Sequence, residues 1–232
     1  MTQRAVSWGD LENAWDLGGL PVASGATQHG RIFRSMSPDR LNASGWNDVL
    51  DAGIDTIVDL RNDDEVSSAV VRPVGLTVIR SSIEDQSDTD FMSLWGERLG
   101  SPEYYPEILR RWPGLVAAAV TAIAEAPGSV LFHCGAGRDR TGMISAIIEQ
   151  LVGVDRAAIL NDYSAAVRAY NSWLWVNPGR EKPMSDDEVD AHLESALPEL
   201  EAFLDTHDFE SYLIAAGVTP RQLDRLRSRL LD

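Results

Sequence analysis

The sequence predicts an α/β fold in which a mostly parallel central sheet is flanked by helices on both faces. Four short runs are rich in β-branched and apolar residues, as strands usually are. These runs cover residues 31–34, 54–60, 76–80 and 129–134. Helical patterns lie between them, and strands that alternate with helices are typical of a parallel sheet covered on both sides.

The helices are predicted from the spacing of apolar residues and from signals at their ends. One pattern covers residues 44–52 and ends at Gly53, and another covers 114–126 and ends at Pro127-Gly128. Residues 141–151 follow the last predicted strand and place apolar side chains on one helical stripe. The segment between residues 134 and 141 therefore joins a strand to a helix.

The rest of the chain is predicted to be helical. Capping boxes at Ser185–Glu188 and Thr219–Gln222 indicate two helix starts within residues 185–232, and Pro198 is expected to kink or divide the first of these helices. Residues 85–100 and 177–186 are polar and poorly periodic, which indicates surface loops. Residues 86–112 are either part of a lid over a site or an ordinary surface insertion.

Length and charge restrict the function. A chain of 232 residues suits a single domain, here taken as residues 1–232. The formal net charge of −16 argues against nucleic acid as a partner and against stable association with anionic membranes. The first ten residues contain no apolar core of a signal peptide, so we expect a cytoplasmic protein.

The only cysteine, Cys134, lies at the end of a predicted strand and just before a predicted helix. A nucleophilic thiol must be a thiolate, and an ordinary cysteine is mostly protonated at neutral pH. A glycine-containing turn before a helix directs peptide N–H groups and the positive end of the helix dipole at one point. Such surroundings lower the pKa of a thiol to about 3.5–7.5 in known cases. The position therefore suits a reactive cysteine.

The same turn is suited to binding phosphate. Gly135 and Gly137 allow the backbone to curl around an anion, and Arg140 can return to the same centre and hold two phosphate oxygens. Arginine is common in this chain, so a Cys-x5-Arg spacing alone is weak evidence. The neighbouring residues strengthen it, because the strand, the turn and the helix all lie where a phosphate loop needs them.

The motif resembles the phosphate loop of protein tyrosine and dual-specificity phosphatases. It is similar to that of a bacterial tyrosine phosphatase family that includes a mycobacterial enzyme of triple specificity. The similarity extends to Asp16–Leu20, Gly30–Ser35, Ile57–Arg61 with Glu65, Asp162-Tyr163 and the C-terminal pairs Tyr212-Leu213 and Gly217-Val218. The resemblance implies a cysteine phosphatase fold with an extra lid and C-terminal helices.

The resemblance also implies roles within the loop. Cys134 would form a phosphocysteine intermediate, Arg140 would bind the phosphoryl oxygens, and Thr141 would assist departure of the thiolate. His133 would hold the loop from behind. The implied phosphate-binding set is Gly135, Ala136, Gly137, Arg138, Asp139, Arg140 and Thr141.

The general acid has two main candidates. The resemblance favours Asp139, although two flanking arginines would keep it ionised. The rival is Asp85, which lies where related phosphatases carry a mobile acid loop, and Asp88 and Asp90 follow it closely. Asp59 and Arg61 are expected to form a structural polar pair at a strand end.

We expect a phosphatase that needs no metal and no cofactor. Its partner would be a phosphorylated protein or a small phosphomonoester, and phosphotyrosine is the first expected substrate. Phosphoserine and phosphothreonine are further candidates. Arg138 at the rim adds phosphoinositides as another candidate substrate class. An alternative is a phosphate-binding docking module without turnover. A sulfurtransferase or an arsenate reductase would also use a cysteine loop, but the latter usually needs further cysteines.

Overall fold

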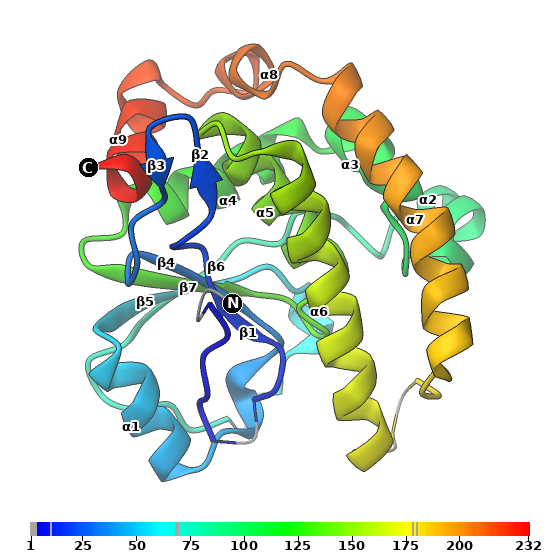
Figure 1. Ribbon diagram of the computed structural model, residues 1–232, viewed down its shortest axis with the longest axis horizontal. Coiled ribbons are helices and arrows are strands. Elements are labelled where there is room, and N and C mark those ends of the chain that lie inside the picture. The colour runs from blue at the N-terminus through cyan, green and yellow to red at the C-terminus, as the bar shows by residue number, and fades with distance from the viewer. Residues whose placement is uncertain (1–3, 10, 68–69, 178, 180) are drawn as a thin grey trace.

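The structure, a computed structural model, describes residues 4–9, 11–67, 70–177, 179 and 181–232 (Figure 1). Its main sheet has the strand order β1-β4-β7-β5-β6. The strands are β1 (Ala14–Asp16), β4 (Ile32–Ser35), β7 (Ser129–His133), β5 (Ile54–Asp59) and β6 (Thr77–Arg80). β4, β7, β5 and β6 pair in parallel, and only β1 is antiparallel to its neighbour. The predicted α/β fold class is confirmed.

Helices cover both faces of this sheet, as predicted. Figure 1 shows α1 (Ala43–Asp51) on one side of the strands, and α4 (Pro113–Glu125) and α5 (Asp139–Leu151) on the other. Side chains of β7 alternate between the faces, because successive residues of a strand point to opposite sides. Val130 and Phe132 join the large core under α4 and α5, whereas Leu131 joins the core under α1.

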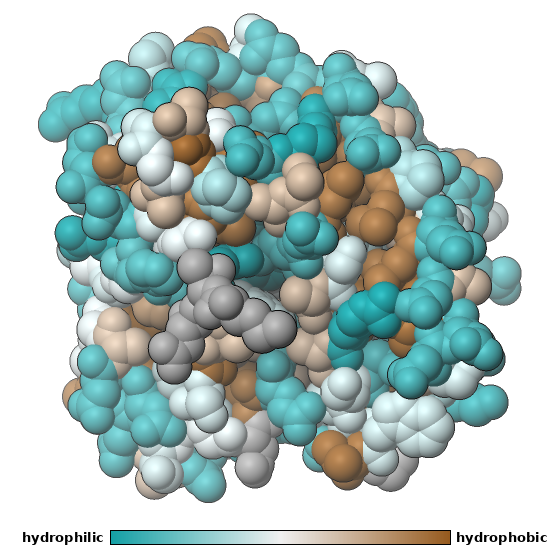
Figure 2. Space-filling model, viewed as in Figure 1, coloured by the Kyte–Doolittle hydropathy of each residue, from teal (hydrophilic) through white to brown (hydrophobic). Residues whose placement is uncertain are grey.

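Four more helices follow in the described C-terminal part, and the first of them, α6, contributes side chains to both cores. These are α6 (Arg156–Val176), α7 (Asp186–Thr206), α8 (Phe209–Ala215) and α9 (Pro220–Leu231). The capping boxes predicted at Ser185 and Thr219 are both formed. Figure 2 shows a mostly hydrophilic surface with an apolar strip between α6 and α7. No helix of the described part of the chain is long and apolar enough to cross a bilayer.

Two predictions of local structure need correction, and some strands were not predicted. Residues 85–100 are not a loop, because they contain α2 (Thr89–Trp95) and a 3-10 turn, η3 (Gly96–Arg98). The helix is too short to show periodicity, and its one fully buried side chain, Phe91, packs edge-on against Trp112 with 4.9 Å between ring centroids. Pro198 does not divide α7. The sequence analysis also missed β1 and the hairpin of β2 (Pro21–Val22) and β3 (Gly25–Ala26).

The remaining short elements lie near one edge of the sheet. They are η1 (Pro38–Arg40), η2 (Asp63–Glu65), η4 (Pro102–Tyr104) and α3 (Tyr105–Arg111). η1 and η2 follow the carboxyl ends of β4 and β5, the two strands that pair with β7. The carboxyl ends of adjacent parallel strands meet at one edge, which is where open α/β sheets usually bind ligands.

Candidate active site

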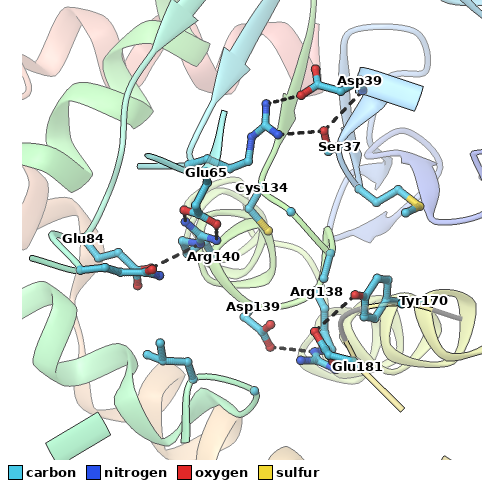
Figure 3. A pocket seen from close by; sticks show the side chains of 18 of the residues that line it. Ser37, Asp39, Glu65, Glu84, Cys134, Arg138, Asp139, Arg140, Tyr170 and Glu181 are labelled. Atoms are coloured by element: carbon cyan, nitrogen blue, oxygen red, sulfur yellow. Dashed lines mark hydrogen bonds and ion pairs between the residues drawn. The ribbon is translucent and has the colours of Figure 1, made fainter. Parts of the chain in front are cut away.

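The loop from Cys134 to Arg138 lies at this edge, between the end of β7 and the first turn of α5. Cys134 lines a cavity of about 930 Å³ together with Gly135, Ala136, Arg138, Asp139 and Arg140. Figure 3 shows the sulfur between the Arg140 side of this cavity and the Arg138 side. The structure therefore brings most of the predicted site residues together.

The backbone of the loop is turned toward the sulfur. Gly137 donates a backbone N–H to Sγ of Cys134 over 3.3 Å. Gly137 has φ of +71°, and a Cβ at this position would lie 2.4 Å from the backbone nitrogen of Met36. Only glycine fits both restrictions. Cys134 itself is 2% exposed, so a reagent must enter the cavity to reach it.

Arg140 reaches the cavity from the first turn of α5 and is held there by two carboxylates. Both oxygens of Glu65, at the end of η2, accept hydrogen bonds from its two Nη atoms. Oε1 of Glu84 lies 3.4 Å from Nε of Arg140. The guanidinium is thus preorganised before any ligand arrives. The sequence analysis assigned no role to Glu65 or Glu84, because neither lies near the motif in the chain.

The two carboxylates differ in their surroundings. Burial opposes ionisation of Glu65, but the hydrogen bonds and the charge of Arg140, together with hydrogen bonds from Asn62, outweigh it and lower the pKa of Glu65. Glu84 is 1% exposed, and burial raises its pKa although Arg140 acts in the opposite direction. Glu65 is therefore the principal counter-charge of Arg140, and Glu84 is the group more readily protonated.

His133 lies directly beneath the loop. It is completely buried, and burial lowers its pKa, so the ring is neutral at pH 7. Nδ1 lies 3.0 Å from the carbonyl oxygen of Cys134; since a carbonyl can only accept, we assign the ring proton to Nδ1. The predicted pair of Asp59 and Arg61 is confirmed, with hydrogen bonds of 2.9 and 2.7 Å.

Asp139 and Arg138 form the other side of the cavity. Arg138 donates from Nε to the carboxylate of Asp139 over 2.9 Å, and its guanidinium lies over the ring of Tyr170. Glu181 approaches both Arg138, at 3.5 Å, and the hydroxyl of Tyr170, at 3.3 Å (Figure 3). The Asp139 carboxylate thus faces the same cavity as Cys134.

Asp85 lies elsewhere. It lines a neighbouring cavity of about 680 Å³ and not the one that contains Cys134. Its carboxylate accepts hydrogen bonds from the N–H and the hydroxyl of Ser87. Asp88 caps α2 and pairs with Arg111. The structure therefore separates Asp85 from the thiol and places Asp139 beside it.

Thr141 occupies the first turn of α5 and is fully buried. Its hydroxyl makes no hydrogen bond to Cys134 or to any other described residue. Among the described residues, no three His, Cys, Asp or Glu side chains come together as metal ligands. The chemistry open to this arrangement is nucleophilic attack by the thiol on an anion held by the loop amides and Arg140.

Replacing Gly137 with alanine tests the loop geometry. The new Cβ would collide with the Met36 backbone and the positive φ would be strained, so the loop must open. We expect the Kd of inorganic phosphate to rise by about tenfold or more, the loss expected from one or more hydrogen bonds. Gly114→Ala is the control, because a Cβ there meets no atom within 4 Å and Gly114, on α4, does not line the cavity. Equal binding by both variants would contradict this geometry.

Replacing Glu65 with glutamine tests the ion pair with Arg140. The pKa of Glu65 is lowered in the folded state, so the pair contributes stability above the ordinary value of 4.5 and loses it as the pH falls through the lower folded value. We expect Glu65→Gln to lower the free energy of unfolding by roughly 1.5–3 kcal/mol at pH 7. Urea titrations should show this difference shrinking toward pH 3.

Glu103→Gln is the control for this measurement, because Glu103 pairs with Arg98 at an exposed position. Its unfolding free energy should change little at either pH. If Glu65→Gln behaved in the same way, the Arg140 pair would be dispensable for stability.

Comparison with known proteins identifies the family of the chain. The model of the tyrosine phosphatase family matches residues 6–232. A Cupriavidus necator protein named as a candidate tyrosine-protein phosphatase is 27% identical over 178 residues, which are 68% of this chain and 61% of that protein. The triple specificity protein phosphatase PtpB of Mycobacterium tuberculosis is 29% identical over 185 residues, which are 66% of this chain and 67% of that protein.

The crystal structure of P. aeruginosa TpbA is a weaker match, with a TM-score of 0.42, 18% identity and coverage of 81% of this chain and 87% of that one. This likeness carries no argument about the site. The family model, in contrast, covers the sheet, the phosphate loop and the C-terminal helices in one match. The chain belongs to the tyrosine phosphatase family.

Proposed function

We propose that this chain hydrolyses phosphomonoesters through a phosphocysteine intermediate, with phosphotyrosine in proteins as its main substrate. The observation that carries the proposal is the convergence of the Cys134 thiol, the Gly137 N–H and the Arg140 guanidinium at one cavity. Three groups suited to a nucleophile, an oxyanion donor and a phosphate clamp thus come from one short loop. The family match supports the same activity.

In the first step, the Cys134 thiolate attacks phosphorus and the bond from phosphorus to the leaving oxygen breaks. Charge on the equatorial oxygens is met by the loop amides and by Arg140, which supply most of the stabilisation in phosphoryl transfer. Asp139 donates a proton to the leaving oxygen. In the second step, water attacks the phosphocysteine, gives its proton to Asp139, and the thiolate leaves with inorganic phosphate as the product.

The cavity supports an aromatic substrate. Its volume of about 930 Å³ exceeds what a phosphate group needs, and its walls include Tyr104, Tyr170 and Trp173. Aromatic side chains favour stacking or edge contacts with an aromatic leaving group. The charge of −16 disfavours nucleic acid and stable residence on anionic membranes. A catalytic thiol must stay reduced, so we place the reaction in the cytoplasm.

We propose further that residues 86–112 act as a lid on a single phosphatase domain, with residues 185–232 as its C-terminal helices. Met92, Glu97 and Leu99 from this segment line the cavity. A Cβ at Gly100 would lie 3.2 Å from the Arg138 guanidinium, so the segment approaches the phosphate loop closely. These contacts support a cover over the site.

Replacing Cys134 with serine tests the proposed activity. Wild-type protein should release phosphate from p-nitrophenyl phosphate in the presence of a chelator, and Cys134→Ser should lose this turnover by at least about 10³-fold, because a serine hydroxyl is not ionised at neutral pH. The variant should still bind inorganic phosphate. Binding by the wild type without any release would support the docking module instead, and unchanged turnover by the variant would exclude the cysteine mechanism.

Replacing Asp139 with asparagine tests the general acid. A positioned acid contributes about 10²–10⁴-fold, and it matters most for a poor leaving group. We expect Asp139→Asn to reduce kcat by about that factor on a phosphotyrosine peptide, and far less on p-nitrophenyl phosphate, whose leaving group needs no proton. Asp85→Asn should resemble the wild type on both substrates. The reverse pattern would assign the acid role to Asp85.

A further inference from the structure

The phosphate loop is held from behind by hydrogen bonds to its carbonyl groups. Four consecutive carbonyl oxygens of the loop each accept a hydrogen bond. Three of the donors, on His133, Asn13 and Arg34, belong to residues that do not line the cavity, whereas the fourth, Ser37, does line it. The pairs are Cys134 with His133 Nδ1 at 3.0 Å, Gly135 with the Ser37 N–H at 3.0 Å, Ala136 with Asn13 Nδ2 at 2.9 Å, and Gly137 with Arg34 Nη2 at 2.7 Å.

This pattern determines where the N–H groups of the loop point. In a planar trans peptide unit the C=O and the following N–H point in opposite directions. The described residues contain no cis peptide bond. A carbonyl turned to the rear therefore turns the next N–H toward the cavity. The unit between Ala136 and Gly137 shows this directly, with its carbonyl on Asn13 and its N–H on the sulfur of Cys134.

Asn13 is suited to hold one of these units. It is completely buried just before β1, and its Oδ1 accepts a hydrogen bond from the indole of Trp15 over 2.8 Å. Its own backbone carbonyl accepts a bond from the Met36 N–H. The orientation of the amide is thus settled, because Oδ1 is engaged and Nδ2 must face the carbonyl of Ala136.

Arg34, which lies on β4, holds the next peptide unit, between Gly137 and Arg138. It is 1% exposed, and its guanidinium joins the Gly137 carbonyl to the carboxylate of Asp162 on α6. Asp162 also accepts a hydrogen bond of 2.5 Å from Arg4. Two guanidinium groups share one carboxylate here.

The charge of this buried group favours an anion above it. Burial opposes ionisation of Asp162, but Arg34 and Arg4 outweigh it and lower its pKa. The neighbouring Glu149 is fully buried, and burial followed by the charge of Asp162 raises its pKa, which favours its protonated form. Arg4, Arg34 and Asp162 then carry one net positive charge behind the loop. Such a charge is least costly when an anion occupies the loop.

We propose that Asn13 and Arg34 are positioning residues, which hold the N–H groups of Gly137 and Arg138 toward the bound phosphate and the thiolate. Neither residue touches the cavity, since neither is among its lining residues. Their effect passes through the carbonyls of Ala136 and Gly137. This inference rests on the proposed function for its ligand, a phosphate group, but concerns different residues.

Asn13→Asp tests the proposal with almost no change in the shape of the side chain. The Nδ2 donor that faces the Ala136 carbonyl is replaced by a carboxylate oxygen, so this carbonyl loses its hydrogen bond. We expect the Kd of inorganic phosphate to rise by about tenfold or more, as for loss of one hydrogen bond to a charged ligand. Alkylation of Cys134 by iodoacetamide should reach half its maximal rate at a higher pH than in the wild type, because the thiolate loses an aligned N–H.

Gln150→Glu is the matched control. Gln150 donates from Nε2 to the carbonyl of Leu204 over 3.1 Å at the far end of α5, so the substitution makes the same chemical change away from the loop. Phosphate affinity and the alkylation profile should both stay at wild-type values. If the two variants lost stability alike and neither changed phosphate affinity, Asn13 would be a structural residue only and the proposal would be wrong.

A measurement on wild-type protein covers the case in which Asn13→Asp does not fold. In ¹H–¹⁵N spectra, the amide resonances of Gly137 and Arg138 should move downfield when inorganic phosphate is added, because both N–H groups gain a charged acceptor. Unmoved resonances at saturating phosphate would overturn the proposal. Both tests measure the binding of phosphate and not its release from an ester. If this protein bound phosphate but hydrolysed no ester, the proposed function would be wrong and the positioning roles would still stand.

Discussion

The site depends on one constraint, which is that several peptide N–H groups in a short turn must face the same point. A peptide unit cannot turn its N–H toward an anion without turning its carbonyl away, and a buried carbonyl needs a donor. The loop after β7 meets this demand with donors from Asn13 just before β1, from Arg34 on β4 and from Ser37, two residues after β4. The antiparallel β1 and its flanking residues are therefore part of the support of the site.

A second constraint concerns charge. The chain carries a net charge of −16, yet the proposed activity needs positive charge where a phosphate would bind. The structure buries arginines that are already oriented by carboxylates: Glu65 holds Arg140 at the cavity, and Asp162 holds Arg34 behind the loop. Arginine is suited to this, because its planar fork can bind a carboxylate on one edge and still offer N–H groups on another. Orientation is thus completed during folding and not during binding.

The sequence predicts local structure, but it does not predict contacts between residues that are far apart in the chain. The strands β4, β5, β6 and β7, the helix α5 and the pair of Asp59 and Arg61 follow from short patterns, and the structure confirms them. The partners that hold the loop leave no such pattern: Glu65 is 75 positions from Arg140, and Arg34 is 128 positions from Asp162. A seven-residue helix such as α2 fails for a different reason, because two turns are too few to show a periodic face.

The proposed lid and the proposed general acid are joined at Asp139. The hydroxyl of Tyr105, at the start of α3, donates to the backbone carbonyl of Asp139 over 2.9 Å, and Tyr105 is itself packed edge-on against Tyr104 and Phe203. The first turn of α5 therefore has one contact with the proposed lid and another, through Arg138, with the rim. If residues 86–112 move as the proposed lid, displacement of α3 would release the carbonyl of Asp139, and one tyrosine would couple access to the thiol with the position of the Asp139 carboxylate.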